Sequence, residues 1–221
     1  MKNKTILAAA ILFLGLSGCV EHEIIPAPIP HVDLECSFKG LVNGTDIEMT
    51  QNVLGYYLNN SKSKIILPSP ASSSAVYFAD IRSDQTLRSM AIGLGSINWD
   101  ASASSEPTLA MFNAFFTAAP NTNPVYATAG ANGFEVKYRD NNGDVWTSKP
   151  NDAGQSVTFS NIVQESDETG DYSKYTCTFT CTVYHTFMIT TTDPDTGQIT
   201  VTPNEQSLVI ANGVYKGWFK R

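Results

Sequence analysis

Acidic and amide side chains alternate in three predicted turns, a spacing that could bind calcium. Calcium takes roughly six to eight oxygen ligands, and a tight turn can supply about three of them. The same residue types also stabilise hairpin turns, because they tolerate positive φ and form local hydrogen bonds. The turns are therefore weak calcium candidates, and we expect no other cofactor. They contain Asp140, Asn142 and Asp144; Asp193 and Asp195; and the acidic side chains of residues 165–171.

Residues that could perform acid–base or nucleophilic catalysis are sparse. His22 and His31 fall in the N-terminal segment, so His185 is the one histidine of the main domain. A serine hydrolase needs a nucleophile, a base and an orienting acid, and the chain has no Gly-x-Ser-x-Gly motif. We expect His185 to be a hydrogen-bonded histidine near the end of a sheet. The sequence predicts a protein without catalytic residues, with a hydrolase acting through loop carboxylates as the least favoured alternative.

Two tryptophans could stack on a sugar ring at the rim of a β-domain. Trp146 follows a predicted hairpin and Trp99 ends a predicted strand. Aromatic rings at such positions either face a ligand or cover the end of the core. Trp99 and Trp146 are therefore ligand-binding candidates, with core packing as the alternative.

Three cysteines of the main domain, Cys36, Cys177 and Cys181, leave an odd number for pairing. On one strand, Cys177 and Cys181 would lie roughly 13 Å apart, which is beyond disulfide range. Cys36 could bond to either one if the first strand lies near the later one. Alternatively, all three are buried thiols that pack as small apolar side chains.

Cys19 follows an N-terminal leader that predicts export and lipidation. Lys2 and Lys4 precede an apolar run over residues 6–16, which is too short for a membrane span that needs roughly 20 residues. The small residues Ser17 and Gly18 suit a signal peptidase, and the Cys19 thiol could accept a diacylglyceryl group. This pattern resembles the lipobox of bacterial lipoproteins. It implies that residues 1–18 are removed and that Cys19 is acylated; an ordinary cleaved signal peptide is the alternative.

Residues 19–31 are predicted to form an extended tether. Pro26, Pro28 and Pro30 favour polyproline II, which spans roughly 35 to 40 Å over about 12 residues. Glu21 and Glu23 resemble the signal that sends lipoproteins of the Bacteroidota to the cell surface. The alternative is a solvated linker on a protein that faces the periplasm.

Charge and length limit the partner classes. The 221-residue chain has a formal net charge of −7, which becomes −9 once the leader removes two lysines. Without a basic stripe to displace counterions, nucleic acid is not expected as a partner. The remaining length suffices for one sizeable β-domain or two small ones.

Residues 32–221 read as an all-β domain, which we expect to be an antiparallel β-sandwich of jelly-roll or Ig-like type. Hairpin signals occur at Asn43-Gly44 and at residues 140–143. The longest alternation covers residues 175–190, with one apolar face and one threonine-rich face, and is long enough to bend or change sheets midway. Further strands are expected at residues 32–38, 53–58, 64–67, 75–82, 87–97, 133–139, 144–148, 198–202, 207–210 and 214–219.

One segment has a helical period instead. Leu109, Phe112 and Phe116 recur at helical spacing, after Pro107 and a possible cap at Ser104 or Ser105. The segment at residues 107–116 predicts a short helix that covers part of the core. Alternatively, its apolar side chains form a patch for a partner.

The overall layout resembles the small uncharacterised outer-membrane lipoproteins of the Bacteroidota. The resemblance rests on the lipobox, the tether, the early Phe38-x-x-Leu41-Val42-Asn43-Gly44, the middle segment over residues 133–148, the late Tyr175-x-Cys177-x-Phe179-x-Cys181, and the terminal segment over residues 212–219. It implies a β-sandwich at the outer membrane and brings no assigned catalytic residues with it.

These patterns together predict a non-enzymatic module, lipid-anchored in the outer membrane and displayed at the cell surface, that binds a partner protein or a glycan. A periplasm-facing structural or assembly lipoprotein of the same fold is the alternative. A binding module predicts aromatic rings clustered on one concave surface. An assembly subunit predicts an exposed strand edge, or an apolar patch around the helix at residues 107–116.

Overall fold

The computed structural model describes residues 31–128 and 132–221. The chain divides into two units, residues 1–30 and residues 31–221, and only the second is described. The predicted signal peptide, Cys19 and nearly all of the tether therefore lie outside the described residues. Within the part of the chain that is described, no helix has both the length and the apolar character needed to cross a membrane.

The described residues form ten strands and two short helices. In chain order they are β1 (Ser37–Val42), β2 (Thr45–Thr50), β3 (Tyr56–Ile65), β4 (Ser73–Ser83), β5 (Ser89–Trp99), α2 (Leu109–Thr117), α3 (Ala119–Thr122), β6 (Phe134–Arg139), β7 (Val145–Ser148), β8 (Ser156–Asp167), β9 (Gly170–Thr192) and β10 (Ile199–Lys220).

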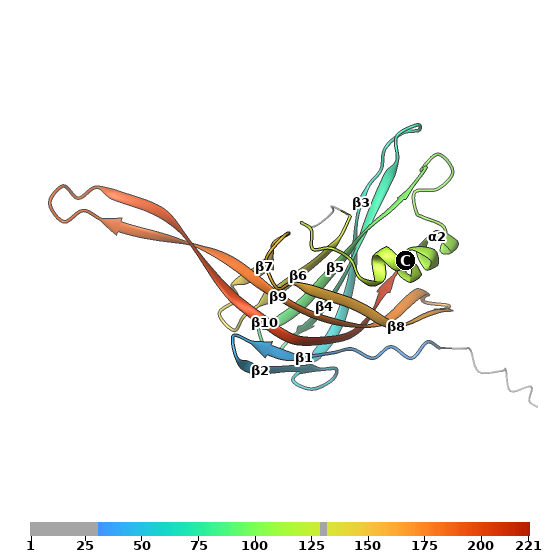
Figure 1. Ribbon diagram of the computed structural model, residues 1–221, viewed down its shortest axis with the longest axis horizontal. Helices are drawn as coiled ribbons and strands as arrows, with labels where there is room; N and C mark the ends of the chain where they lie inside the picture. The colour runs from blue at the N-terminus through green and yellow to red at the C-terminus, as the bar shows by residue number, and fades with distance from the viewer. Residues whose placement is uncertain (1–30, 129–131) are drawn as a thin grey trace, which may run out of the picture. The chain divides into compact units, whose positions relative to one another are not determined.

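All ten strands belong to one antiparallel sheet. Its order is β2-β1-β10-β9-β7-β6-β5-β4-β3. The strand β8 also pairs with β9, along a different part of β9 from the part that pairs with β7. The all-β antiparallel class expected from the sequence is confirmed. The arrangement differs from the expected sandwich, because the apolar faces meet inside one curled sheet and not between two sheets (Figure 1).

Hydrogen bonds across the curl link strands that are distant in the sheet order. The Tyr215 hydroxyl of β10 donates to the Ala79 carbonyl of β4 over 3.0 Å. With its amide oriented to match its neighbours, Asn60 of β3 donates to the Trp218 carbonyl over 2.7 Å and accepts from the Trp218 Nε1 over 2.9 Å. These side chains fasten β10 to the β3–β4 hairpin, so the curled sheet encloses its core.

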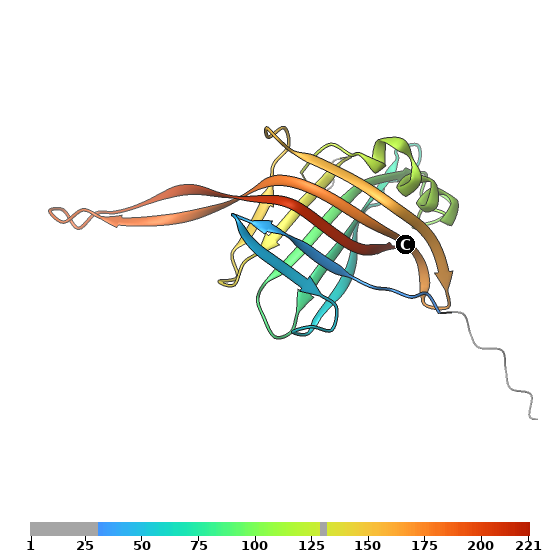
Figure 2. The same cartoon turned by 60° about the horizontal axis from the view of Figure 1, so that its bottom comes forward.

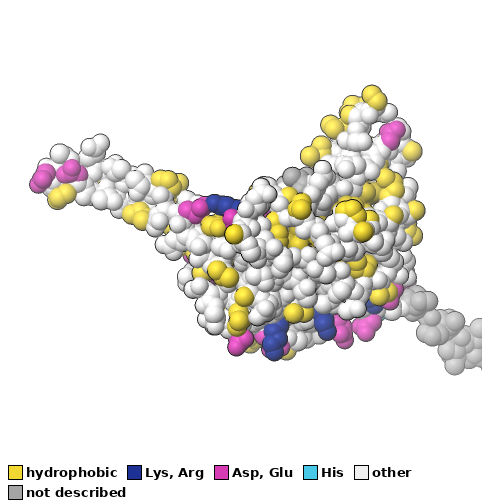
Figure 3. All heavy atoms as spheres, in the orientation of Figure 1, with side chains coloured by type: hydrophobic (Ala, Val, Ile, Leu, Met, Phe, Trp, Pro, Cys, Tyr) yellow, Lys and Arg dark blue, Asp and Glu magenta, His cyan; other side chains and the backbone are white. Residues whose placement is uncertain are grey.

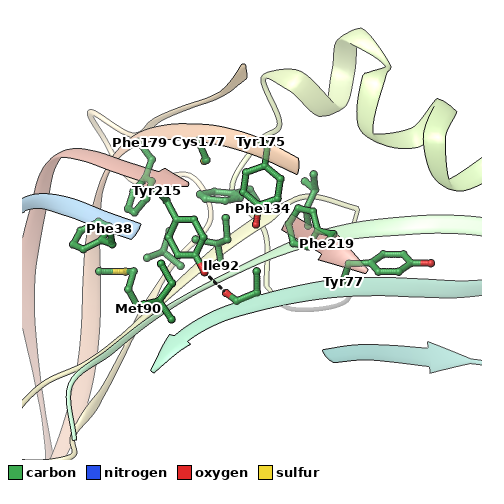
Figure 4. Close-up of a cluster of buried hydrophobic side chains, with 14 of the residues drawn as sticks. Phe38, Tyr77, Met90, Ile92, Phe134, Tyr175, Cys177, Phe179, Tyr215 and Phe219 are labelled. Carbon is green, nitrogen blue, oxygen red and sulfur yellow. Dashed lines mark hydrogen bonds between the residues drawn. The ribbon is translucent and has the colours of Figure 1, made fainter. Parts of the chain in front are cut away.

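Aromatic rings fill the interior of the curl (Figure 4). Phe134 contacts Phe159 and Phe179 edge-on at 5.7 and 5.9 Å between centroids, and Tyr175 lies 4.6 Å from Phe219. Such pairs add to the free energy gained by removing the rings from water. The core is therefore built from side chains of several strands that are remote in sequence.

The helix expected from periodicity is confirmed as α2. Phe112 and Phe116 are buried and pack against Tyr77 and Phe219, while Leu109 remains 39% exposed. The expected cap at Ser104 or Ser105 is wrong, because the Thr108 hydroxyl accepts from the Met111 amide. The helix covers part of the core, so its phenylalanines do not form an exposed patch.

Several strand boundaries differ from expectation. The predicted strands at residues 53–58 and 64–67 are one strand, β3, and the three predicted C-terminal strands are the single strand β10. A bulge in β10 at Asn212, where φ is 53°, lets the strand bend without ending. β8 was not expected at all, and most of the residues predicted as an acidic loop belong to it and to β9.

Candidate functional site

The strands β9 and β10 continue beyond the sheet as a two-stranded arm (Figures 1 and 2). We define the arm as residues 186–205, with the turn at residues 193–198 as its tip. On its outer edge, β9 pairs with β8 and then with β7, whose last partner is Tyr184. The outer edge of β10 is paired with β1 only up to Ile210. Both edges of the arm are therefore unpaired among the described residues.

The ladder of the arm determines which backbone groups point outward. The Asp193 amide donates to the Gln198 carbonyl over 2.9 Å, so residues 193 and 198 form a hydrogen-bonded pair. Antiparallel pairs alternate between hydrogen-bonded and non-hydrogen-bonded types. Along β9, Met188, Thr190 and Thr192 therefore turn their N–H and C=O groups away from β10. These groups form the free β9 edge.

The two edges of the arm are not equivalent. Pro203 lies opposite Met188 and has no N–H, and Glu205 follows on the same strand. Proline and charged residues are devices that block strand pairing at sheet edges. The β9 edge over residues 186–192 has the sequence Thr-Phe-Met-Ile-Thr-Thr-Thr, with no proline and no charge. Only the β9 edge is open to an added strand.

One face of the arm is apolar. Ile199 lies opposite Thr192, Val201 opposite Thr190, and Pro203 opposite Met188, so these side chains share a face. Met188, Val201 and Ile199 are 69%, 56% and 66% exposed. Figure 3 shows hydrophobic side chains along the arm, with acidic ones at its tip. We call this surface the arm face.

The root of the arm is fixed to the sheet. Glu205 pairs with Lys149, whose Nζ lies 4.3 Å from the centre of the Tyr184 ring. The His185 Nδ1 lies 2.8 Å from the Val145 carbonyl, and its ring packs on Phe187. The expected role of His185 as a hydrogen-bonded histidine at a sheet end agrees with this geometry. The root holds the direction in which the arm projects.

In two of the three predicted calcium turns, the first carboxylate accepts hydrogen bonds from within its own turn; in the third, Glu165 pairs with Lys174 and Asp171 with Arg221. Asp140 accepts from the Asn142 and Asp144 amides and from the Trp146 Nε1. Asp193 accepts from the Asp195 and Thr196 amides, and these bonds lower the pKa of Asp193. Among the described residues, no three His, Cys, Asp or Glu side chains gather to hold a metal ion. The local hydrogen bonds account for these residue types.

The two candidate tryptophans are buried and are not available for stacking on a sugar. Trp99 and Trp146 are each 5% exposed. The Trp99 Nε1 donates to the Ser104 carbonyl over 3.0 Å, and Trp146 packs against His185 and Phe187. The structure thus assigns both rings to packing, the alternative stated in the sequence analysis.

The three cysteines of the domain are unbonded, buried thiols. Burial raises the pKa of Cys36 to about 11 and that of Cys181 to about 12. The pKa of Cys177 is also raised, first by burial and then by the nearby Cys181. They pack as apolar side chains and have little thiolate with which to react.

Sequence reasoning missed the arm, although the longest predicted strand, over residues 175–190, runs into it. The available signal was composition: residues 186–192 and 199–204 contain no charged residue. Such segments combine high β-propensity with low charge, the character of strands that pair with another chain.

Comparisons of this chain with protein-family models, with curated proteins and with solved structures find no significant match.

Proposed function

We propose that this protein is a lipid-anchored, non-enzymatic module of the outer membrane that faces outward and binds a partner protein through its arm. The partner adds a β-strand to the β9 edge over residues 186–192. The proposal rests on the contrast between the two edges of the arm. Pro203 and Glu205 block strand pairing along β10, whereas the β9 edge has neither proline nor charge.

The energetics of an isolated hairpin support this proposal. A two-stranded ribbon in water is marginally stable by itself, because neither face is buried. The arm also exposes an apolar face that costs solubility. An added strand would satisfy the outward N–H and C=O groups of β9 and widen the sheet. Its side chains would cover part of the arm face, which is the usual basis of strand addition.

The partner is better described as a protein than as a glycan. Trp99 and Trp146, the rings that could have stacked on a sugar, are buried. The arm offers main-chain hydrogen-bonding groups and aliphatic side chains, which match an extended peptide. These observations favour binding through an exposed strand edge over binding through a surface of aromatic rings.

The position of the first described residues suits an anchored module. The Val32 amide donates to Asp167 Oδ2 over 2.9 Å, and the Lys174 Nζ donates to the Asp33 carbonyl over 3.3 Å. This region lies at the end of the domain opposite the arm (Figure 2). A tether that leaves from this end would leave the arm free to reach away from the membrane.

A matched pair of proline substitutions tests the proposal. Thr190 and Val201 lie opposite each other, and both N–H groups point out of the ladder, one on each edge. Thr190→Pro blocks the β9 edge, whereas Val201→Pro alters the edge that already carries Pro203. The tagged proteins would be purified from gently solubilised native membranes, with partners identified by mass spectrometry.

We expect a stoichiometric partner with the wild-type chain and with Val201→Pro, and loss of that partner with Thr190→Pro. Equal recovery with both variants would contradict strand addition at the β9 edge. Release of the partner-bearing protein from membranes by Cys19→Ala would support the anchor. Digestion of the arm by protease on intact cells would support outward display over the periplasm-facing alternative.

A further inference from the structure

The tip of the arm is acidic and has no cation beside it. Asp193 and Asp195 are the only charged residues of the segment 186–204, and neither has an ion-pair partner among the described residues. Lys149, which pairs with Glu205 at the root, lies roughly 20 Å from the tip at about 3.3 Å per residue along the ladder. Salt screens charges beyond about 8 Å, so this lysine does not neutralise the tip. Figure 3 shows acidic side chains at the tip and basic ones nearer the root.

The turn holds these two carboxylates in an ionised and exposed state. The Asp193 Oδ1 accepts from the Asp195 and Thr196 amides over 2.8 and 3.0 Å. These backbone hydrogen bonds, that of Thr196 first, lower the pKa of Asp193. The Asp195 side chain is exposed and accepts no hydrogen bond from the described residues. Two negative charges therefore lie at the far end of an otherwise uncharged strand edge.

The free stretch of the β9 edge is bounded at both ends. At the root, β7 pairs with the same side of β9 up to Tyr184, and the Val145 carbonyl lies 2.8 Å from the His185 Nδ1. At the tip, Thr192 is the last residue of β9, and Asp193 begins the turn. An added strand therefore covers about residues 187–192. It continues the position of β7 in the sheet, and β7 runs antiparallel to β9.

These limits define the chemistry of the strand that fits. Every described neighbour of β9 is antiparallel to it, and antiparallel pairing is the more stable kind. An antiparallel strand here has its amino-terminal end beside the tip and its carboxyl end at the root. Every second side chain of that strand lies on the arm face, where an apolar group is covered from water. A lysine or arginine just before the paired stretch lies beside Asp193 and Asp195, whereas an acidic residue there meets like charge.

We propose that the strand bound by the arm is an uncharged, alternately apolar segment preceded by lysine or arginine at its amino-terminal end. The inference names the class of partner, and it rests on the proposed strand addition at the β9 edge. A second copy of this chain lacks that feature. Two β9 edges paired about Thr190 would place Phe187 and His185 of one copy beside the acidic tip of the other. Each tip would also approach Asp144, whose Oδ1 lies 3.9 Å from the His185 Nε2.

Three synthetic peptides with blocked ends test the charge and the direction separately. The first is Lys-Lys-Val-Thr-Val-Thr-Val, the second has glutamate in place of both lysines, and the third carries the two lysines at its carboxyl end. Each peptide carries the same neutral fluorophore. Each would be titrated with the lipidated full chain in detergent, and the fluorescence anisotropy gives the Kd.

Two matched double variants locate the charge that the peptides detect. Asp193→Asn with Asp195→Asn removes the tip charges, and an amide oxygen can still accept the hydrogen bonds of the turn. Asp46→Asn with Glu48→Gln removes two exposed charges from β2 and is the control for net charge. Thr190→Pro blocks the β9 edge itself.

We expect the first peptide to bind the wild-type chain about two- to thirty-fold more tightly than the third, which is the range for two exposed ion pairs. The second peptide should bind more weakly still. The preference should vanish in the tip variant, persist in the β2 variant and shrink at high salt. Thr190→Pro should abolish the binding of all three peptides.

Equal affinity for the three peptides, lost in Thr190→Pro, would overturn the inference and leave strand addition intact. A preference for the third peptide would overturn the antiparallel direction and with it the inference. Absence of binding by every peptide at millimolar concentration would refute strand addition as well. Dimers of the chain that sediment as such and disappear in Thr190→Pro would assign the edge to a second copy instead.

Discussion

Removing the arm should leave the stability of the domain almost unchanged while abolishing partner binding. The change replaces residues 188–203 with Asn-Gly, so that these two residues connect Phe187 to Asn204. Counting along the ladder from residues 193 and 198 makes Phe187 and Asn204 a hydrogen-bonded pair. Two residues between such a pair form the type I′ turn that Asn-Gly favours. The shortened hairpin keeps the root contacts of Lys149 and His185.

The magnitude follows from what the deletion removes. It deletes five cross-strand pairs, from Ile199 with Thr192 to Pro203 with Met188. At roughly 0.2–1 kcal/mol each, they would contribute about 1–5 kcal/mol if they were coupled to global unfolding. The deleted side chains are exposed, and none belongs to the core cluster or to the partly buried residues packed against it, so the arm opens locally instead. We expect the free energy of unfolding to change by no more than about 0.5 kcal/mol, a shift in Tm of about 1–2 °C.

Differential scanning calorimetry and urea denaturation measure the stability, and capture from membranes measures partner binding. Hydrogen exchange of the intact protein adds a local readout, because outward amides of the arm should exchange much faster than those of β9 beside β8. A fall in Tm of more than about 5 °C on arm removal would refute the reasoning, since it would make the arm part of the cooperative core. Unchanged partner capture would refute the proposed function.

Three further outcomes are expected. Phe116→Ala should lower the free energy of unfolding by about 3–5 kcal/mol in urea denaturation, because the ring is 3% exposed. Leu109→Ala on the same helix should lower it by less than about 1 kcal/mol, and equal losses would contradict the packing described for α2. Asp140→Ala removes three hydrogen bonds and should cost about 1–3 kcal/mol, with or without calcium; a loss seen only with calcium would instead identify a metal site. The free energy of unfolding should fall as pH rises from about 9 to 11, because the folded state keeps the Cys36 thiol protonated up to a pKa of about 11 while the unfolded chain releases that proton near 9.0. Cys36→Ser should reduce this fall when denaturation is compared at about pH 8 and about pH 10.5. An unchanged pH dependence in the variant would reject the assignment to Cys36.

Local sequence determined the strand faces and several of the turns. Asn43 and Gly44 adopt φ values of 48° and 79°, as a type I′ turn between β1 and β2 requires. The alternation over residues 175–190 gave the apolar face of β9, with Tyr175, Cys177 and Phe179 buried. The helical period of Leu109, Phe112 and Phe116 gave α2. These features depend on contacts between residues close in the chain, so their signals are local.

The pairing of strands depended on the tertiary structure. Nothing local shows that β10 runs unbroken past Asn212, because a bulge resembles a turn in sequence. The closure of one curled sheet depends on Tyr215 meeting Ala79, residues that are 136 positions apart. A sandwich and a curled sheet need the same alternation in each strand, so the pattern could not separate them.

The sequence by itself therefore determined that this chain forms amphipathic antiparallel strands with one short helix, and it predicted a leader that ends directly before Cys19. Only the tertiary structure decided which apolar side chains are buried. Val183 and Ile189 lie on the same face of β9, yet Val183 is in the core and Ile189 is 44% exposed on the arm. The physical reason is that burial depends on which strands lie alongside. The alternation of apolar and polar residues shows which face of a strand is apolar. It does not show where the neighbouring strands end.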